Sequence, residues 1–87
     1  MIERSDMLNN QAITLASEGN FKDAIACFKR AIVIEKENFL LWYNLGITYR
    51  DAGDLENAKN SLATAYIINP IYADVIESYA TICSSCG

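Results

Sequence analysis

The sequence predicts an all-α fold, a right-handed α-solenoid of antiparallel helix hairpins with five helices. Apolar residues recur at three- and four-residue steps along most of the 87 residues, which is the period of a helix with one buried face. The same pattern returns after 34 residues, and a fixed period of this length is typical of a solenoid. Gly19 and Gly53 hold equivalent places in the two copies, where each is expected to end a helix in the left-handed conformation.

The central hairpin carries the clearest pattern. A helix over residues 39–52 presents a broad apolar ridge with a glycine notch for close approach, formed by Trp42, Leu45, Gly46 and Tyr49. A second helix over residues 55–68 is expected to pack on this ridge through Ala58, Leu62, Ala65 and Tyr66. The two helices therefore form an antiparallel pair with Trp42 near the centre of the core.

The first hairpin repeats this arrangement with weaker residues. Its helices are expected over residues 3–18 or 5–18 and over residues 21–35. The first buries Met7, Leu8, Ala12, Leu15 and Ala16, and the second buries Phe21, Ala24, Ile25, Phe28, Ala31 and Ile32. Asn20 and Asp54 follow the two turn glycines and are expected to cap the helices that begin there.

Asn69 and Pro70 are expected to close the fourth helix and to open a fifth over about residues 71–83, because Asn caps well and Pro is tolerated at a first helical position. It carries two apolar stripes. The stripe expected to close the stack contains Tyr72, Ile76, Tyr79 and Cys83. The other stripe is expected to face solvent and to form a symmetric homodimer or bind a partner helix through Ile71, Val75 and Ile82. Burial of this second stripe, which would leave a monomer, stays open.

The residues from Trp42 to Pro70 match the signature W-x2-L-G-x2-Y…A-x3-F…P throughout, with Leu62 at the aromatic position. The chain therefore resembles the tetratricopeptide repeat (TPR) family. The resemblance divides a single domain, residues 1–87, into a first repeat at about 5–38, a second at about 39–72 and a half repeat or capping helix at about 73–87. The first copy departs from the signature, since Gln11 and Lys36 replace the usual Leu and Pro.

The resemblance implies a non-catalytic scaffold for protein–protein interaction, with a peptide or helix bound in a concave groove that the first helix of each repeat lines. The groove positions are Asn9, Asn10, Ile13, Tyr43, Asn44, Ile47, Arg50, Asp74, Glu77 and Ser78. No basic residue follows Lys59, so the C-terminal part of this groove is acidic and suits a basic partner. A second interpretation, in which Tyr43 and Ile47 merely pack on neighbouring helices, stays open.

One subfamily of TPR proteins binds chaperone C-terminal carboxylates with a clamp of Lys and Asn on the first helix, Asn on the third, and Lys and Arg on the fifth. The matching positions in this chain are Asn9, Ile13, Asn44, Asp74 and Ser78. Only Asn44 agrees with the clamp. A peptide carboxylate would be repelled at Asp74, so this mode of binding is not expected.

Composition narrows the other function classes. The chain has a net charge of −4 and no His, which makes nucleic acid an unexpected partner and leaves no recognisable catalytic constellation, metal site or cofactor motif. No apolar run reaches the ~18 residues that span a bilayer, and the N-terminus has no signal-sequence pattern, so a cytoplasmic location is expected. A structural piece of a longer repeat array is a further interpretation that stays open.

The C-terminal run from Cys83 to Cys86 has the C-x-x-C spacing. Such a pair can form a redox disulfide or supply half of a zinc site, so a redox- or metal-responsive domain is the alternative from another function class. Its position at the end of a helix disfavours a thiolate, and Cys27 is expected to lie far from it. The simpler interpretation makes Cys83 a small buried apolar residue on the register of Leu15 and Tyr49.

Overall fold

A computed structural model of the chain describes residues 4–86, with side chains to residue 84. This part of the chain contains five helices and no strand: α1 (Ser5–Ser17), α2 (Phe21–Ile34), α3 (Phe39–Asp51), α4 (Leu55–Ile68) and α5 (Ala73–Cys86). α1, α3 and α5 begin at Ser5, Phe39 and Ala73, so the 34-residue period predicted from the sequence is confirmed. The all-α fold with five helices is likewise confirmed.

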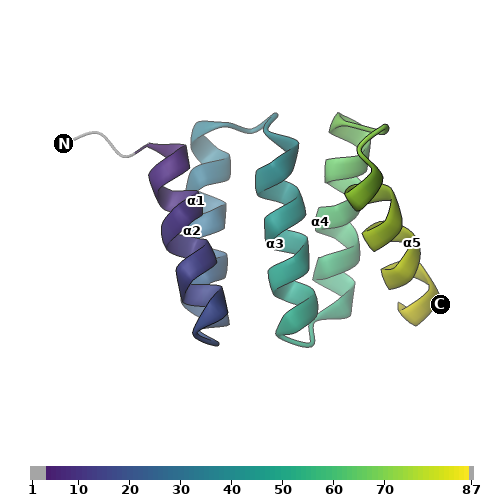
Figure 1. The fold of residues 1–87 in the computed structure, drawn as a ribbon, viewed down its shortest axis with the longest axis horizontal. Helices are drawn as coiled ribbons and strands as arrows, with labels where there is room; N and C mark the ends of the chain where they lie inside the picture. Colours follow the sequence, from purple (N-terminus) through teal and green to yellow (C-terminus); the bar gives the residue numbers. More distant parts are fainter. Residues whose placement is uncertain (1–3, 87) are drawn as a thin grey trace.

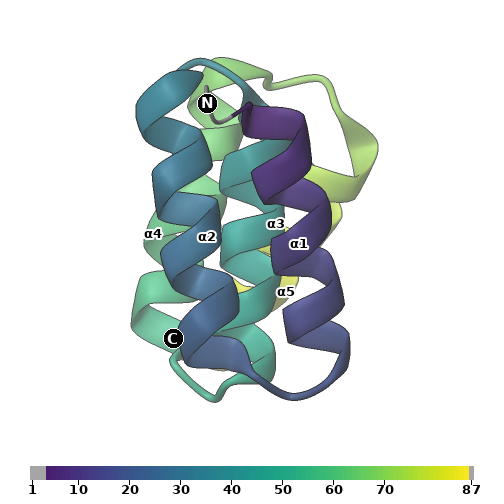
Figure 2. The ribbon, with the colours of Figure 1, turned by 90° about the vertical axis from the view of Figure 1, so that its left-hand side faces the viewer.

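The helices form an elongated two-layer stack of 43 × 26 × 16 Å (Figure 1). α1, α3 and α5 form one layer and α2 and α4 form the other, as the view along the stack shows (Figure 2). Each helix packs mainly on its neighbours in sequence, and weaker contacts join α1 to α3 and α3 to α5. α1 and α5 therefore lie at opposite ends of the stack, and each has described helices on one side only along the stack.

The two predicted glycine turns are confirmed. Gly19 and Gly53 have φ angles of 83° and 89°, a region that favours glycine because it has no Cβ. After α1, the amide of Asn20 donates to the carbonyl of Leu15 at 2.9 Å. After α3, the amide of Asp54 donates to the carbonyl of Tyr49 at the same distance. These are the long hydrogen bonds of a Schellman motif, which satisfies the last carbonyls of each helix. The same turn is thus built twice.

The helix caps differ from the predictions at two places. Asp54 caps α4 as expected, accepting a hydrogen bond from the amide of Asn57 at 3.2 Å, but Asn20 makes no side-chain cap bond to α2. Asn69 does not open α5. It ends α4 and accepts from the amide of Ile71 at 3.3 Å, which closes a local turn, so α5 begins only at Ala73.

The core explains why three predictions of burial were wrong. In α3 and α5, the third residue of the helix packs on the preceding repeat, and Leu41 and Val75 there are 2% and 0% exposed. Met7 holds the same position in α1 but is 61% exposed, because α1 is the first described helix and has no described repeat on that side. Tyr66, expected to pack on α3, is 40% exposed and its ring centroid lies 6.0 Å from that of Tyr79 in α5. Trp42, expected at the centre of the core, is only partly buried and packs against its edge. The largest fully buried side chains are instead Phe28, Leu62, Ile82 and Val75.

Gly46 is the closest approach between α3 and α4, as the notch in the sequence predicted. A Cβ at this position would lie 2.8 Å from Cγ of Leu62 and 3.3 Å from the carbonyl oxygen of Ala58. Leu62 has no exposed surface and Cγ is near the base of its side chain, so it has little room to move. Ala12 and Phe28 hold the equivalent positions in the first hairpin, and both are buried there.

We predict that Gly46→Ala destabilises the fold by about 1 kcal/mol. Overpacking against Leu62 costs roughly 1–3 kcal/mol, and the better helix propensity of Ala returns up to about 1 kcal/mol. Urea unfolding measures the change. In a Leu62→Ala background the same Gly46→Ala change should cost less, because the Cγ atom that the new Cβ meets is absent. A Gly46→Ala variant that is more stable than the wild type would contradict the close approach.

We predict that Asp54→Ala lowers the melting temperature clearly more than Asn20→Ala, the matched control, because only Asp54 accepts a capping hydrogen bond. Bonds from the side-chain and backbone amides of Asn57 hold the pKa of Asp54 below its usual value. A pKa lowered in the folded state contributes stability above the unfolded pKa of about 3.9, and this contribution is lost as the pH falls through the folded value. The advantage of the wild type over Asp54→Asn should therefore shrink below about pH 4. Equal melting temperatures for the two alanine variants would show that the cap does not stabilise α4.

Candidate functional site

The ten predicted groove positions all lie on α1, α3 and α5, whose outward side forms one face of the stack. Five of them are half-buried, namely Asn9, Tyr43, Asn44, Ile47 and Ser78. The other five are exposed, namely Asn10, Ile13, Arg50, Asp74 and Glu77. Because helices at the 34-residue period lie side by side in one layer, residues far apart in sequence share this face (Figure 2). We call it the odd-helix face.

A hydrogen bond joins the first two helices of this face. The side-chain amide of Asn44 donates to the side-chain oxygen of Asn9 at 3.0 Å, and the pair is partly buried. Burial makes such a bond worth more than an exposed one, since either partner left alone would be desolvated without compensation. Asn44 thus holds α3 against α1 with one N–H of its side-chain amide, and this bond fixes the orientation of the side chain.

The apolar centre of the face is shared between packing and exposure. Tyr43 and Ile47 both pack against the buried core, yet each keeps part of its surface open. Both residues therefore fill space between helices, as the second interpretation expects, but each also keeps some surface exposed. Their remaining surface lies between the polar side chains of α1 and the acidic side chains of α5, so a ligand on this face would meet both kinds of group.

An aromatic cluster at one end of the face was missed by the sequence analysis. The ring of Tyr72 lies 4.9 Å from that of Phe39 and 6.5 Å, edge-on, from that of Tyr43, measured between centroids. Tyr72 precedes α5 instead of lying within it, and this turn directs its ring toward α3. The four-residue spacing of Phe39 and Tyr43 was the available signal, because residues at that spacing share a helix face.

The charges on the odd-helix face are uneven. Arg50 is paired with Asp51 at 3.3 Å, with both side chains well exposed. Asp74 and Glu77 are exposed on α5, and no Lys or Arg lies within ion-pair distance of either in the described part of the chain. The α5 side of the face therefore carries unpaired negative charge.

The predicted outer stripe of α5 is wrong in two of its three members. Val75 and Ile82 are 0% and 2% exposed. They hold the positions in α5 that Leu41 and Thr48 hold in α3, and residues at these positions pack on the preceding repeat. Only Ile71, 87% exposed, lies open. The stripe expected to close the stack is the more exposed one. It contains Tyr72 and Ile76, which are 36% and 43% exposed, and the half-buried Tyr79 and Cys83.

The cysteines offer no assembled metal centre in the described residues. Cys27 is a buried free thiol in α2, and Cys83 is a half-buried free thiol in α5, at the other end of the stack (Figure 1). Among the described residues no group of three His, Cys, Asp or Glu side chains is placed to hold a metal ion. The side chain of Cys86 lies outside the described residues, so the alternative in which it pairs with Cys83 stays open, and thiol titration tests it.

Models of known protein families match this sequence. A family model described as TPR repeat matches residues 12–50, and one described as tetratricopeptide repeat matches residues 40–72. The chain belongs to the tetratricopeptide repeat family. No curated protein shows significant sequence similarity to this TPR chain. None of the described TPR helices is long and apolar enough to cross a membrane.

Solved TPR domains share the fold. The second TPR domain of Spaghetti (RPAP3), bound to the HSP90 peptide SRMEEVD, superposes with a TM-score of 0.90 at 22% identity, over 95% of this chain and 77% of that one. The TPR domain of Sgt2 from Aspergillus fumigatus gives 0.86 at 20% identity, over 90% and 52%. The first TPR domain of Spaghetti, bound to the same peptide, gives 0.85 at 17% identity, over 90% and 62%. This chain thus spans about half of the Sgt2 domain.

Proposed function

We propose that this TPR chain is a non-catalytic protein-interaction scaffold whose odd-helix face binds a peptide or helix with net positive charge. The observation that carries the proposal is the unpaired acidic pair Asp74 and Glu77 beside the partly open apolar side chains of Tyr43 and Ile47. An amphipathic segment with Lys or Arg next to an apolar residue complements both features.

The solved neighbours support peptide binding and also show where this chain differs. The HSP90 peptide bound by the two Spaghetti domains contains one basic and three acidic side chains. In this chain the clamp positions predicted from the family contain Asp74 and Ser78 on α5, so a cation is replaced by an anion. The remaining clamp residue, Asn44, is already bonded to Asn9. The charge preference of this face should therefore be the reverse.

We predict that Asp74→Lys/Glu77→Lys weakens binding of a basic amphipathic peptide by roughly 1–3 kcal/mol, because the variant replaces attraction by repulsion at the α5 side of the face. Fluorescence anisotropy with a labelled peptide of alternating Lys and Leu measures this change. Glu18→Lys/Glu56→Lys is the control, since it changes the net charge equally at two exposed positions off the odd-helix face. Its effect should be much smaller.

Two outcomes of that experiment would contradict the proposal. One is an equal loss of affinity in both double variants, which would reflect net charge and not a site. The other is tighter binding of SRMEEVD than of the basic peptide by the wild type. A Tyr43→Ala/Ile47→Ala variant, which leaves the bond between Asn44 and Asn9 in place, supplies the apolar half of the test. It should reduce affinity for the basic peptide while leaving its salt dependence unchanged.

A homodimer through α5 is a second candidate, favoured by the exposure of Tyr72 and Ile76. The predicted band of Ile71, Val75 and Ile82 cannot supply this surface, because two of its members are already covered within the chain. We predict that any dimer seen by sedimentation at tens of micromolar dissociates to the 9.7 kDa monomer in Ile76→Glu and persists in Ile13→Glu, which changes an exposed Ile at the other end of the stack. A monomer at every concentration would remove this candidate.

A further inference from the structure

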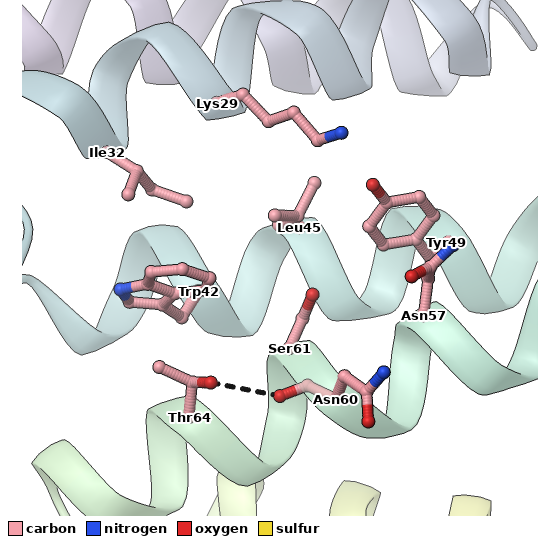
Figure 3. A pocket seen from close by; sticks show the side chains of 9 residues that line it. All are labelled: Lys29, Ile32, Trp42, Leu45, Tyr49, Asn57, Asn60, Ser61 and Thr64. Atoms are coloured by element: carbon pink, nitrogen blue, oxygen red, sulfur yellow. Dashed lines mark hydrogen bonds between the residues drawn. The ribbon is translucent and has the colours of Figure 1, made fainter.

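A cavity of about 300 Å³ opens on the opposite side of the molecule from the odd-helix face. It lies between α2 and α4, and α3 forms its floor (Figure 3). The side chains that line it come from all three helices and are Lys29, Ile32, Trp42, Leu45, Tyr49, Asn57, Asn60, Ser61 and Thr64. We call it the even-helix cavity.

The floor of the cavity is apolar and fixed in position. The indole N–H of Trp42 donates to the backbone carbonyl of Lys36 at 2.9 Å, so the polar atom of this ring is satisfied away from the cavity. The ring is only partly buried and supplies most of the open apolar surface, because Leu45 and Ile32 beside it are 3% and 8% exposed (Figure 3). An aromatic or aliphatic side chain placed there would bury surface on both sides of the contact.

The rim of the cavity is neutral except for one cation. Nζ of Lys29 lies 5.9 Å from the centroid of the Tyr49 ring, and Lys29 has no carboxylate partner within the described part of the chain. The remaining rim groups are amides and hydroxyls on α4, including Thr64, whose hydroxyl donates to the carbonyl of Asn60 at 3.0 Å. No acidic side chain lines the cavity.

The two layers of the stack carry charge of opposite sign. α2 and α4 contain four basic and two acidic residues, namely Lys22, Lys29, Arg30 and Lys59 against Asp23 and Glu56. α1, α3 and α5 contain one basic and four acidic residues, namely Arg50 against Asp6, Asp51, Asp74 and Glu77. A partner that suits one layer is therefore repelled by the other, and the two faces select different charges.

We propose that the even-helix cavity is a second binding site, which takes one apolar or aromatic side chain of an acidic peptide segment. The side chain would lie on Trp42, and a neighbouring carboxylate would pair with Lys29. A volume of about 300 Å³ is at the lower end of the range for small-molecule pockets, which suits a single anchor side chain better than a larger ligand. The site is separate from the proposed peptide-binding face, so the scaffold binds two partners of opposite charge at once.

Trp42 makes this proposal directly measurable, because it is the one Trp of the chain and lines the cavity. The probe is a capped seven-residue peptide with a central Phe between two runs of three acidic residues. Titration of this peptide should shift the tryptophan emission in a saturable way. A peptide with Ser in place of Phe, and one with Lys in place of the acidic residues, should bind at least fivefold more weakly.

Two charge reversals on α2 separate the site from the overall charge. Lys29→Glu removes the cation on the rim and should weaken binding at least fivefold, whereas Lys22→Glu makes the same change in net charge off the cavity and should weaken it less than twofold. Thr64→Phe fills the cavity and should abolish the emission change while the circular dichroism melt stays cooperative. Asp74→Lys/Glu77→Lys should leave the acidic probe bound at least as tightly, which distinguishes this site from the odd-helix face.

The proposal would be overturned by the absence of saturable binding of the acidic Phe peptide at millimolar concentration. Equal weakening by Lys29→Glu and Lys22→Glu would also overturn it, since binding would then depend on net charge alone. An unchanged response in a folded Thr64→Phe variant would place the peptide elsewhere and have the same consequence.

Discussion

α3, in the middle of this stack, packs on two different neighbours, and most features of the structure follow from that requirement. It contacts α4 through one stripe and the preceding repeat through another, with Gly46 on the first and Leu41 on the second. Residues of α3 outside these two stripes, such as Tyr43 and Ile47, are only partly covered. The odd-helix face is therefore a surface that packing covers incompletely.

The close approach of α3 and α4 also shapes the opposite side. Gly46 lets Leu62 and Ala58 lie directly on the α3 backbone, which fills the middle of the second hairpin with aliphatic side chains. Trp42 and Tyr49 are then displaced toward the junction with α2, where they form the floor of the even-helix cavity. The Trp42 ring is therefore not completely buried by the core, and its open part is a surface that a ligand could contact.

The opposite charges of the two layers connect these packing rules to function. Each repeat contributes its first helix to one layer and its second helix to the other. The charged residues of either face can therefore change without changing the core. The unpaired Lys29 and the unpaired Asp74 and Glu77 each lie beside a partly open apolar group, and that combination gives both affinity and selectivity in peptide recognition. If both proposals hold, the two faces would bind two partners without competition between them.

The sequence alone determined the parts of this protein that depend on local chemistry and on period. The glycine turns and four of the helix starts follow from backbone preferences and a 34-residue repeat, and they were predicted correctly. The same repeat assigns ten positions to the odd-helix face. What those positions do as a binding face is still a prediction. The helix start at Ala73 was missed because the side chain of Asn69 closed a turn instead of capping a helix, a choice between two bonds that the sequence leaves equal.

Only the tertiary structure decided which apolar stripe each helix buries. Met7 and Val75 hold the same position in their helices, yet one is exposed and the other fully buried, because among the described residues only the second has a preceding repeat to pack on. The periodicity of α5 shows two stripes but not which neighbour covers them. The even-helix cavity arises from the distance between α2 and α4, which no sequence spacing records. Burial in a repeat protein depends on the neighbours of a helix as much as on its own residues.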